Sequence, residues 1–255
     1  MAATPAWPPR SAPRLFIEQE LADDAQVNIG GNQAHYLSRV MRVTPGDAVI
    51  LCDNITGEWS ARVAEAGKRN VALELVEHLR PREEVPDFWL CAALLKKDRF
   101  DLVLEKATEL GVAKIQPVIT RRCVADKLNM DRARQIMIEA AEQCARTALP
   151  RIAEPVKLDA LVKNWPGDRV LYFADEEGGE PAAKRFARHL PPAALLVGPE
   201  GGFDDGERDK VRKMMETRAI TLGPRILRGE TAAIAGMALW MATMGDWCET
   251  SDGQE

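Results

Sequence analysis

The chain has 255 residues, of which 46% are hydrophobic and 29% charged, and its 34 basic and 39 acidic side chains leave a formal charge of −5. This composition supports a buried core in one or two domains, which excludes wholesale disorder and a small disulfide-stapled fold. The longest uncharged run, residues 231–245, is shorter than the roughly 20 residues that cross a bilayer, so we expect no membrane span. The acidic balance also disfavours extensive phosphate binding, which requires Lys and Arg.

Neither the cysteines nor the histidines are spaced like a metal site or a disulfide framework. The five cysteines include no close pair, and the three histidines lie far apart in the sequence. We therefore expect reduced thiols in a cytoplasmic protein, and no bound metal. Residues 1–13 are rich in Pro and Ala without a continuous apolar run, which predicts a flexible tail and not a secretory signal. Residues 249–255 are expected to form a second tail.

The segment 14–80 alternates short apolar runs with turn clusters, a pattern typical of a small β-barrel. One helix is predicted at 32–42, where an apolar stripe lies opposite three basic side chains. The stripe consists of Ala34, Leu37, Val40 and Met41. The expected strands are 14–18, 46–53, 58–66 and 70–79, and residues 81–87 are expected to form a linker.

From Phe88 to residue 248, apolar strands alternate with amphipathic helices. This alternation predicts an α/β domain whose parallel sheet is covered by helices on both faces. Helices are expected after Asp98 and Asp131 as N-caps, over 181–189, from about Asp204 and from Glu230. The expected strands are 88–95, 113–120, 169–174, 193–197 and 218–222.

The densest signal for chemistry is LLVGPEGGF at 195–203, an apolar strand that enters a Gly-Pro loop. Loops at the carboxyl ends of parallel strands are where such sheets bind ligands, although the glycines are equally consistent with a simple turn. The following helix starts with acidic residues, which would repel a phosphate, and no dinucleotide or P-loop motif is present. A neutral or cationic ligand therefore fits better, and Glu200 could face the sulfonium of S-adenosylmethionine.

A second Gly-Pro loop occurs in TLGPRILRGET at 221–231. Arg228 stands just before a helix start, where a guanidinium can grip a carbonyl, carboxylate or phosphate, although a surface ion pair is the alternative. Glu230 and Thr231 are expected to cap the last helix. Small residues in that helix allow a close homodimer contact, although a buried core helix would show the same pattern.

The two loops form part of a wider resemblance. Together with KKDRFDLVLEKATELGV at 96–112, PVITRRC at 117–123 and EAAEQCARTALP at 139–150, they resemble the SPOUT methyltransferases. Within that superfamily, the match is to the bacterial 16S ribosomal RNA uridine-N3 methyltransferase family, from Arg14 to about Trp247. The resemblance implies a PUA-like β-barrel at 14–80 and a SPOUT domain at 88–248 with a deep trefoil knot. It also implies a homodimer that holds S-adenosylmethionine in the knot.

The same resemblance assigns the site residues. Arg228 and Glu200 would lie nearest the methyl group and the base, with Arg228 stabilising negative charge on uracil and Glu200 a candidate base or sulfonium partner. The implied cofactor-binding residues are Phe173, Gly198, Pro199, Glu200, Gly201, Gly202, Thr221, Leu222, Gly223, Ile226 and Leu227.

The implied substrate is uridine 1498, in the usual bacterial rRNA numbering, of 16S rRNA in the small ribosomal subunit. Positive charge is concentrated at 96–134, with 10 basic against 6 acidic residues. The RNA-binding candidates are His35, Arg39, Arg42, Arg121, Arg122, Lys127, Gln143 and Arg146. Two other functions use the same scaffold: a non-catalytic RNA-binding factor for ribosome assembly, and a ribose 2′-O methyltransferase of the superfamily.

Overall fold

The computed structural model describes residues 7–248. The first six residues of the predicted tail 1–13, and all of the predicted tail 249–255, lie outside the described residues. The contacts divide the chain into two units, one that runs to Glu84 and includes 141–149, and one that comprises 85–140 and the chain from Pro150. No helix within 7–248 is long and apolar enough to cross a membrane.

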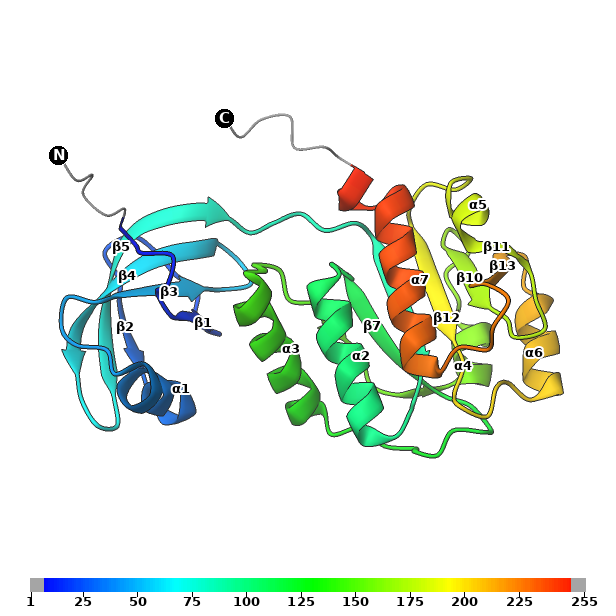
Figure 1. The fold of residues 1–255 in the computed structure, drawn as a ribbon, viewed down its shortest axis with the longest axis horizontal. Coiled ribbons are helices and arrows are strands. Elements are labelled where there is room, and N and C mark those ends of the chain that lie inside the picture. Colours follow the sequence, from blue (N-terminus) through cyan, green and yellow to red (C-terminus); the bar gives the residue numbers. More distant parts are fainter. Residues whose placement is uncertain (1–6, 249–255) are drawn as a thin grey trace. The chain divides into compact units, whose positions relative to one another are not determined.

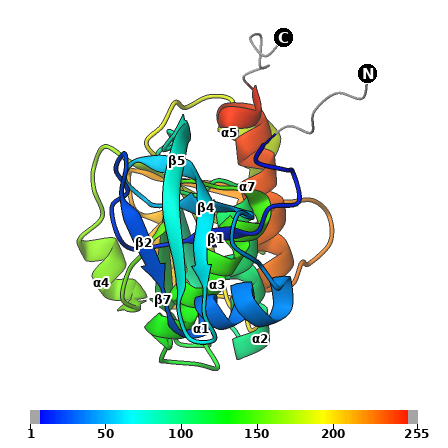
Figure 2. The same ribbon diagram turned by 90° about the vertical axis from the view of Figure 1, so that its left-hand side faces the viewer.

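The first unit, which faces the viewer in Figure 2, is built on a sheet of five strands. Their order is β1-β3-β4-β5-β2. The parallel β1–β3 pair is joined to antiparallel neighbours. Each of the four predicted strands has an observed counterpart, whereas β2, in which buried and exposed residues alternate, was not predicted. The strands are β1 Arg14–Phe16, β2 Gln26–Ile29, β3 Ala48–Cys52, β4 Gly57–Ala66 and β5 Val71–Pro81.

The predicted helix 32–42 is observed, but it changes from an α-helix to a π-helix halfway along. It begins as α1 Gly31–His35 and continues as the π-helix η1 Tyr36–Met41. Ala34 and Leu37 are buried as predicted, but the rest of the predicted apolar stripe was wrong, because Val40 is 63% exposed. In a π-helix the backbone hydrogen bonds join residues five apart, whereas in an α-helix they join residues four apart. The wider turn moves the last side chains of the helix away from the face that α-helical spacing predicts.

The second unit contains an all-parallel sheet with the order β11-β13-β10-β12-β6-β7-β8, and β9 also pairs with β7. This confirms the predicted parallel sheet. Three strands of two residues each were not predicted: β8 Arg151–Ile152, β9 Val156–Lys157 and β11 Glu180–Pro181. The five predicted strands are observed as β6 Phe88–Ala93, β7 Lys114–Ile119, β10 Val170–Ala174, β12 Ala193–Val197 and β13 Thr217–Thr221.

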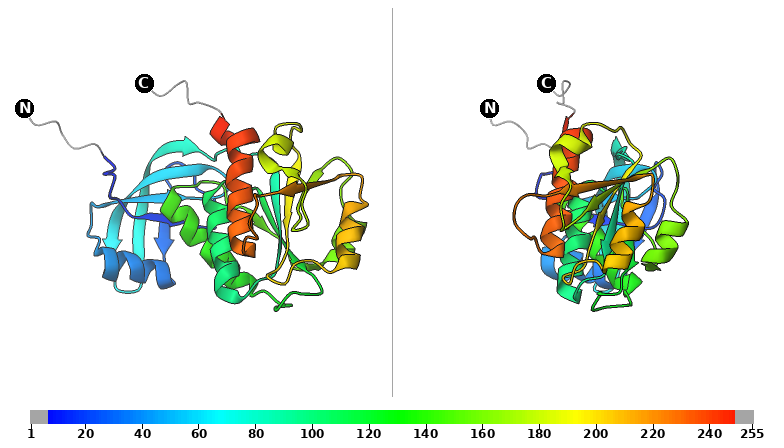
Figure 3. Two further views of the ribbon diagram at one scale, coloured as in Figure 1. Left: turned by 45° about the vertical axis from the view of Figure 1, so that its right-hand side comes forward. Right: turned by 90° about the vertical axis from the view of Figure 1, so that its right-hand side faces the viewer.

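Helices cover both faces of this sheet, as predicted. Leu195 of β12 joins one apolar core, while its neighbours Ala194 and Leu196 join the other, because adjacent side chains of a strand point to opposite faces. The first core receives α2 Lys97–Glu109, α3 Met130–Cys144, α5 Ala182–Phe186 and α7 Gly229–Met244. The second receives α4 Leu158–Lys163, which was not predicted, and α6 Asp205–Arg212. Figure 1 shows α2 and α7 side by side, and Figure 3 shows α7 running along the sheet.

The helix starts correct two of the predicted N-caps. Lys96 precedes α2, so Asp98 lies inside the first turn. Asn129 precedes α3, and its Oδ1 accepts a hydrogen bond from the Arg132 amide at 3.0 Å, so Asp131 also lies inside the first turn. Both carboxylates still favour the positive end of the helix dipole. The short 3-10 helix η2 Asp246–Cys248 follows α7. The trefoil knot stays a prediction of the family resemblance.

Candidate functional site

The carboxyl ends of β10, β12 and β13 meet at one edge of the parallel sheet and surround a cavity of about 160 Å³. The first turn of α7 closes it from the other side. Apolar side chains and glycine-rich backbone dominate the wall, which suits a ligand held largely by shape and by peptide groups. The lining consists of residues 174–176, 197–199, 202–203, 220–227, 229 and 232.

Most of the predicted cofactor-binding residues lie in this lining, so the structure brings the two Gly-Pro loops together. Those in the lining are Gly198, Pro199, Gly202, Thr221, Leu222, Gly223, Ile226 and Leu227. Three others do not line the cavity. Phe173 is fully buried, with its ring 5.0 Å from that of Phe203, whereas Glu200 and Gly201 lie on the exposed part of their loop. Ligand contacts by all eleven stay predictions.

Two glycines of the first loop are required by their surroundings. Gly202 has a φ of +68°, and a Cβ there would collide with the Glu176 carboxylate. A Cβ at Gly198 would lie 2.6 Å from the Phe203 ring. The loop therefore packs tightly on one side against Phe203 and on the other against a carboxylate.

Sequence reasoning missed the acidic residues that line the cavity. Asp175 and Glu176 directly follow β10, and both contact Arg208 of α6. Arg212 also reaches Asp175, with 2.5 Å between its Nη2 and Oδ2. Burial disfavours the charged form of Arg208, but the neighbouring Glu177, Glu176 and Asp175 carboxylates outweigh it and raise the pKa of its guanidinium. Asp175 and Glu176 follow the carboxyl end of a parallel strand, and this position was the sequence signal that could have identified them.

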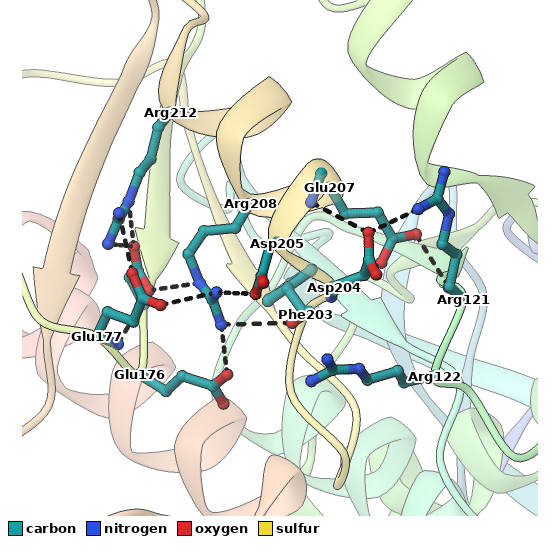
Figure 4. Close-up of polar contacts among 12 residues, drawn as sticks. Arg121, Arg122, Glu176, Glu177, Phe203, Asp204, Asp205, Glu207, Arg208 and Arg212 are labelled. Carbon is teal, nitrogen blue, oxygen red and sulfur yellow. Dashed lines mark hydrogen bonds and ion pairs between the residues drawn. The ribbon is translucent and has the colours of Figure 1, made fainter.

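The acidic start of α6 is engaged in local bonds (Figure 4). Asp204 is the N-cap of this helix, which was predicted to start at about this residue, and it forms a capping box with Glu207. Arg121 places its Nη1 2.6 Å from Asp204 Oδ1 and donates its backbone amide to Glu207 Oε1. Arg122 donates through Nη1 to the Gly201 carbonyl at 3.0 Å. Arg121 thus ties the segment after β7 to the start of α6, and Arg122 ties it to the first Gly-Pro loop, while both remain exposed.

The candidate catalytic residues have different surroundings. Arg228 is exposed, and its side chain makes no ion pair with any residue between 7 and 248, so the alternative of a surface ion pair was wrong within that range. Glu200 lies 3.9 Å from the Nε of Arg99, and the same Arg99 binds Glu230 at 2.5 Å. Glu230 therefore pairs with Arg99, and α7 has no side-chain cap from it. Sequence reasoning missed Arg99, which follows β6 at the same edge of the sheet.

The remaining RNA-binding candidates are mostly at the surface. His35, Arg39, Arg42, Lys127 and Gln143 are exposed. Arg146 is the exception among these candidates, because α3 ends at Cys144 and Ala145 takes a φ of +62°. The chain turns inward there, and Arg146 is only 5% exposed, with its Nε 3.9 Å from Glu83. Between residues 7 and 248, no group of three His, Cys, Asp or Glu side chains could hold a metal ion.

Known families account for most of the chain. An RNA methyltransferase domain model matches residues 82–241, and an RNA methyltransferase PUA domain model matches 29–76. The chain is 33% identical to the ribosomal RNA small subunit methyltransferase E of Rickettsia conorii, over 92% of this chain and 97% of the relative. It is 30% identical to the same protein of Bacillus subtilis, over 88% and 94% of the two chains.

A solved structure agrees with these relatives. The ribosomal RNA small subunit methyltransferase E of Neisseria gonorrhoeae, crystallised with S-adenosylmethionine, superposes with a TM-score of 0.83. The two are 29% identical, and the match covers 92% of this chain and 99% of the other. The PUA-like first unit and the parallel-sheet methyltransferase unit are therefore those of one known family. The chain belongs to the ribosomal RNA small subunit methyltransferase E family, within the SPOUT methyltransferases.

Proposed function

We propose that this protein transfers a methyl group from S-adenosylmethionine to N3 of one uridine of 16S rRNA, uridine 1498 in bacterial numbering, within the small ribosomal subunit. The observation that carries the proposal is the cavity formed by the two Gly-Pro loops after β12 and β13 together with the start of α7. Family membership supports the reaction class, because the relatives are named for methylation of small-subunit rRNA.

The residues around the cavity fit this cofactor. Apolar walls such as Leu222 and Leu227 suit the flat adenine ring, and the peptide groups of the glycine loops suit its polar edge. Glu176 supplies a partly exposed carboxylate for positive charge on the ligand, and Arg225 supplies a cation for a carboxylate. When bound, S-adenosylmethionine provides an electrophilic methyl group on a positively charged sulfur.

In this proposal, Arg228 binds the uracil ring of the substrate and not the cofactor. N3 of uridine is a weakly acidic imide, and negative charge spreads onto the ring oxygens when its proton leaves. An exposed guanidinium without a partner in the described chain is available to donate hydrogen bonds to one of those oxygens while N3 stays open to the methyl group. Glu200 is a candidate to receive the proton or to face the sulfonium, and Arg99 lies near enough to orient it.

Replacing Arg228 tests the catalytic assignment. Loss of a preorganised group that stabilises developing charge typically lowers the rate by about 10²–10³-fold, and we expect this of Arg228→Ala in single-turnover methylation of small subunits. Arg228→Lys should recover part of the loss, because it restores charge without the planar fork. Cofactor binding by calorimetry should be unchanged in both variants. Methyl transfer by Arg228→Ala at the wild-type rate would remove Arg228 from the reaction.

The methylated position tests the function itself. We expect small-subunit RNA from cells lacking the gene to have lost one N3-methyluridine, measured by mass spectrometry of mapped RNA fragments. Restoring the wild-type gene should restore the modification, and restoring the Arg228→Ala gene should not. Loss of a ribose 2′-O methyl group would identify the other superfamily reaction. An unchanged RNA profile, together with absence of cofactor binding, would favour a non-catalytic assembly factor.

We further propose a cytoplasmic homodimer whose basic surfaces bind the RNA. His35, Arg39 and Arg42 would contact it from the first unit, and the segment with Arg121, Arg122 and Lys127 from the second. The small-residue helix α7 would pack on its copy in the partner through positions such as Ala235 and Ala238, which are only half-buried. Light scattering of the purified protein should give twice the mass of one chain, and a monomer would remove this part of the proposal.

A further inference from the structure

An acidic group of side chains, which we call the Arg208 cluster, adjoins the cavity through two of its members (Figure 4 shows its polar contacts). It contains four carboxylates and two guanidinium groups, so it carries a formal excess of two negative charges. Its members are Asp175, Glu176, Glu177, Asp205, Arg208 and Arg212. The excess charge stands beside a site proposed to take a cation.

Arg208 fixes the geometry of the cluster from inside the protein. Its side chain is only 6% exposed and lies between β10 and α6. Its Nη2 is 2.6 Å from Glu176, its Nη1 is 2.9 Å from Glu177 and 3.1 Å from Asp205, and Nη2 also donates to the Phe203 carbonyl. If the Arg208 guanidinium moved with one carboxylate, it would lose its bonds to the others. These shared bonds therefore restrain the position of each carboxylate.

Two members of the cluster face the cavity. Asp175 and Glu176 are in the lining, where Arg225 is the other charged residue. Glu176 is 40% exposed and lies against Gly202, where the missing Cβ leaves room for its carboxylate. Asp175 is fully enclosed between Arg208 and Arg212, so its charge is largely compensated. Glu176 therefore presents the less compensated charge to a bound ligand.

We propose that Glu176, held by Arg208, is the residue that makes this site prefer the positively charged cofactor over its neutral product. The inference rests on the proposed function. Transfer of the methyl group turns the sulfonium of S-adenosylmethionine into the neutral thioether of S-adenosylhomocysteine, and the rest of the molecule is unchanged. A fixed negative charge therefore favours the substrate form by Coulomb attraction and favours release of the product form.

The ratio of two affinities tests this role. We expect Glu176→Gln to weaken S-adenosylmethionine binding by about tenfold, which corresponds to roughly 1.4 kcal/mol, and to change S-adenosylhomocysteine binding by less than about twofold. Both dissociation constants would be measured by isothermal titration calorimetry on the full chain, without RNA. Raising the salt concentration should reduce the wild-type ratio, because Glu176 is partly exposed, and should leave the ratio of the variant unchanged.

Glu177→Gln is the matched control. Glu177 belongs to the same cluster and contacts both Arg208 and Arg212, but it is 52% exposed and is not in the cavity lining. We expect the wild-type ratio in this variant. Equal weakening of both ligands by Glu176→Gln, or the same change of ratio in both variants, would overturn the inference. A wild-type protein that binds neither ligand would instead overturn the proposed function.

Discussion

Single residues around the cavity are constrained by contacts as well as by backbone angles. Gly202 combines a left-handed φ with a carboxylate pressed against its Cα, whereas Gly178 has a φ of +110° and no atom within 4 Å of the place of a Cβ. At Gly202 both the backbone angle and a steric clash therefore oppose a side chain, whereas at Gly178 only the backbone angle does. This difference makes the pair informative.

We predict that Gly202→Ala lowers the free energy of unfolding by roughly 1–3 kcal/mol and weakens cofactor binding by about tenfold, because Glu176 must move from the cavity wall. Gly178→Ala should cost about 1 kcal/mol, through backbone strain alone, and should keep the cofactor affinity. Thermal unfolding and calorimetric titration would measure the two quantities. Equal cofactor affinity in the two variants would show that the Gly202 contact does not matter to the ligand.

The N-cap residues show where the sequence was informative at the scale of helices. The helix predicted from about Asp204 has Asp204 as its N-cap, and Glu207 stands three residues later, which is the spacing of a capping box. Asp98 and Asp131 have Asp101 and Arg134 at that spacing, and both proved to lie inside their helices. An Asp near a helix start therefore identified the N-cap only where a Glu stood three residues later to complete the capping box. The change to a π-helix after His35 left no comparable signal.

We predict that Asp204→Ala destabilises the protein by about 1 kcal/mol, because it removes the acceptor for the first turn of α6. Cofactor affinity should fall with it, since α6 carries Arg208. Asp209→Ala is the control, as Asp209 is exposed in the same helix and has no part in the cap. Chemical denaturation of both variants would give the comparison, and an equal loss of stability would mean that the cap contributes nothing.

For the molecule as a whole, hydrophobic periodicity was enough to predict the parallel sheet, its two covered faces and the strand-rich first unit. It missed β8, β9 and β11, because a two-residue strand owes its existence to the neighbour that it pairs with and not to its own pattern. The Gly-Pro loops were recognisable, but the carboxylates of Asp175 and Glu176 became meaningful only when the fold placed them at the same cavity.

Each unit contains one buried thiol that reports on its core. Burial, the largest influence, raises the pKa of Cys52 in the first unit and of Cys91 in the second to about 12. At pH 8 both stay protonated and therefore unreactive. We predict that a thiol reagent leaves both unmodified in the folded protein and labels them after denaturation, while the exposed Cys144 reacts at once. Rapid labelling of either one at pH 8, followed by peptide mass spectrometry, would contradict the enclosed cores.

The nine residues 141–149 pack with the first unit although they follow β6, α2 and β7 of the second in the chain. Their bonds are specific: Glu142 accepts from the Phe16 amide at 2.8 Å, and Glu83 accepts from the Thr147 amide at 2.7 Å. A ribosome that makes this protein must therefore synthesise a large part of the second unit before the first has all of its parts. The first unit to begin is thus completed only when residue 149 has been made, after β6, α2 and β7 of the second unit.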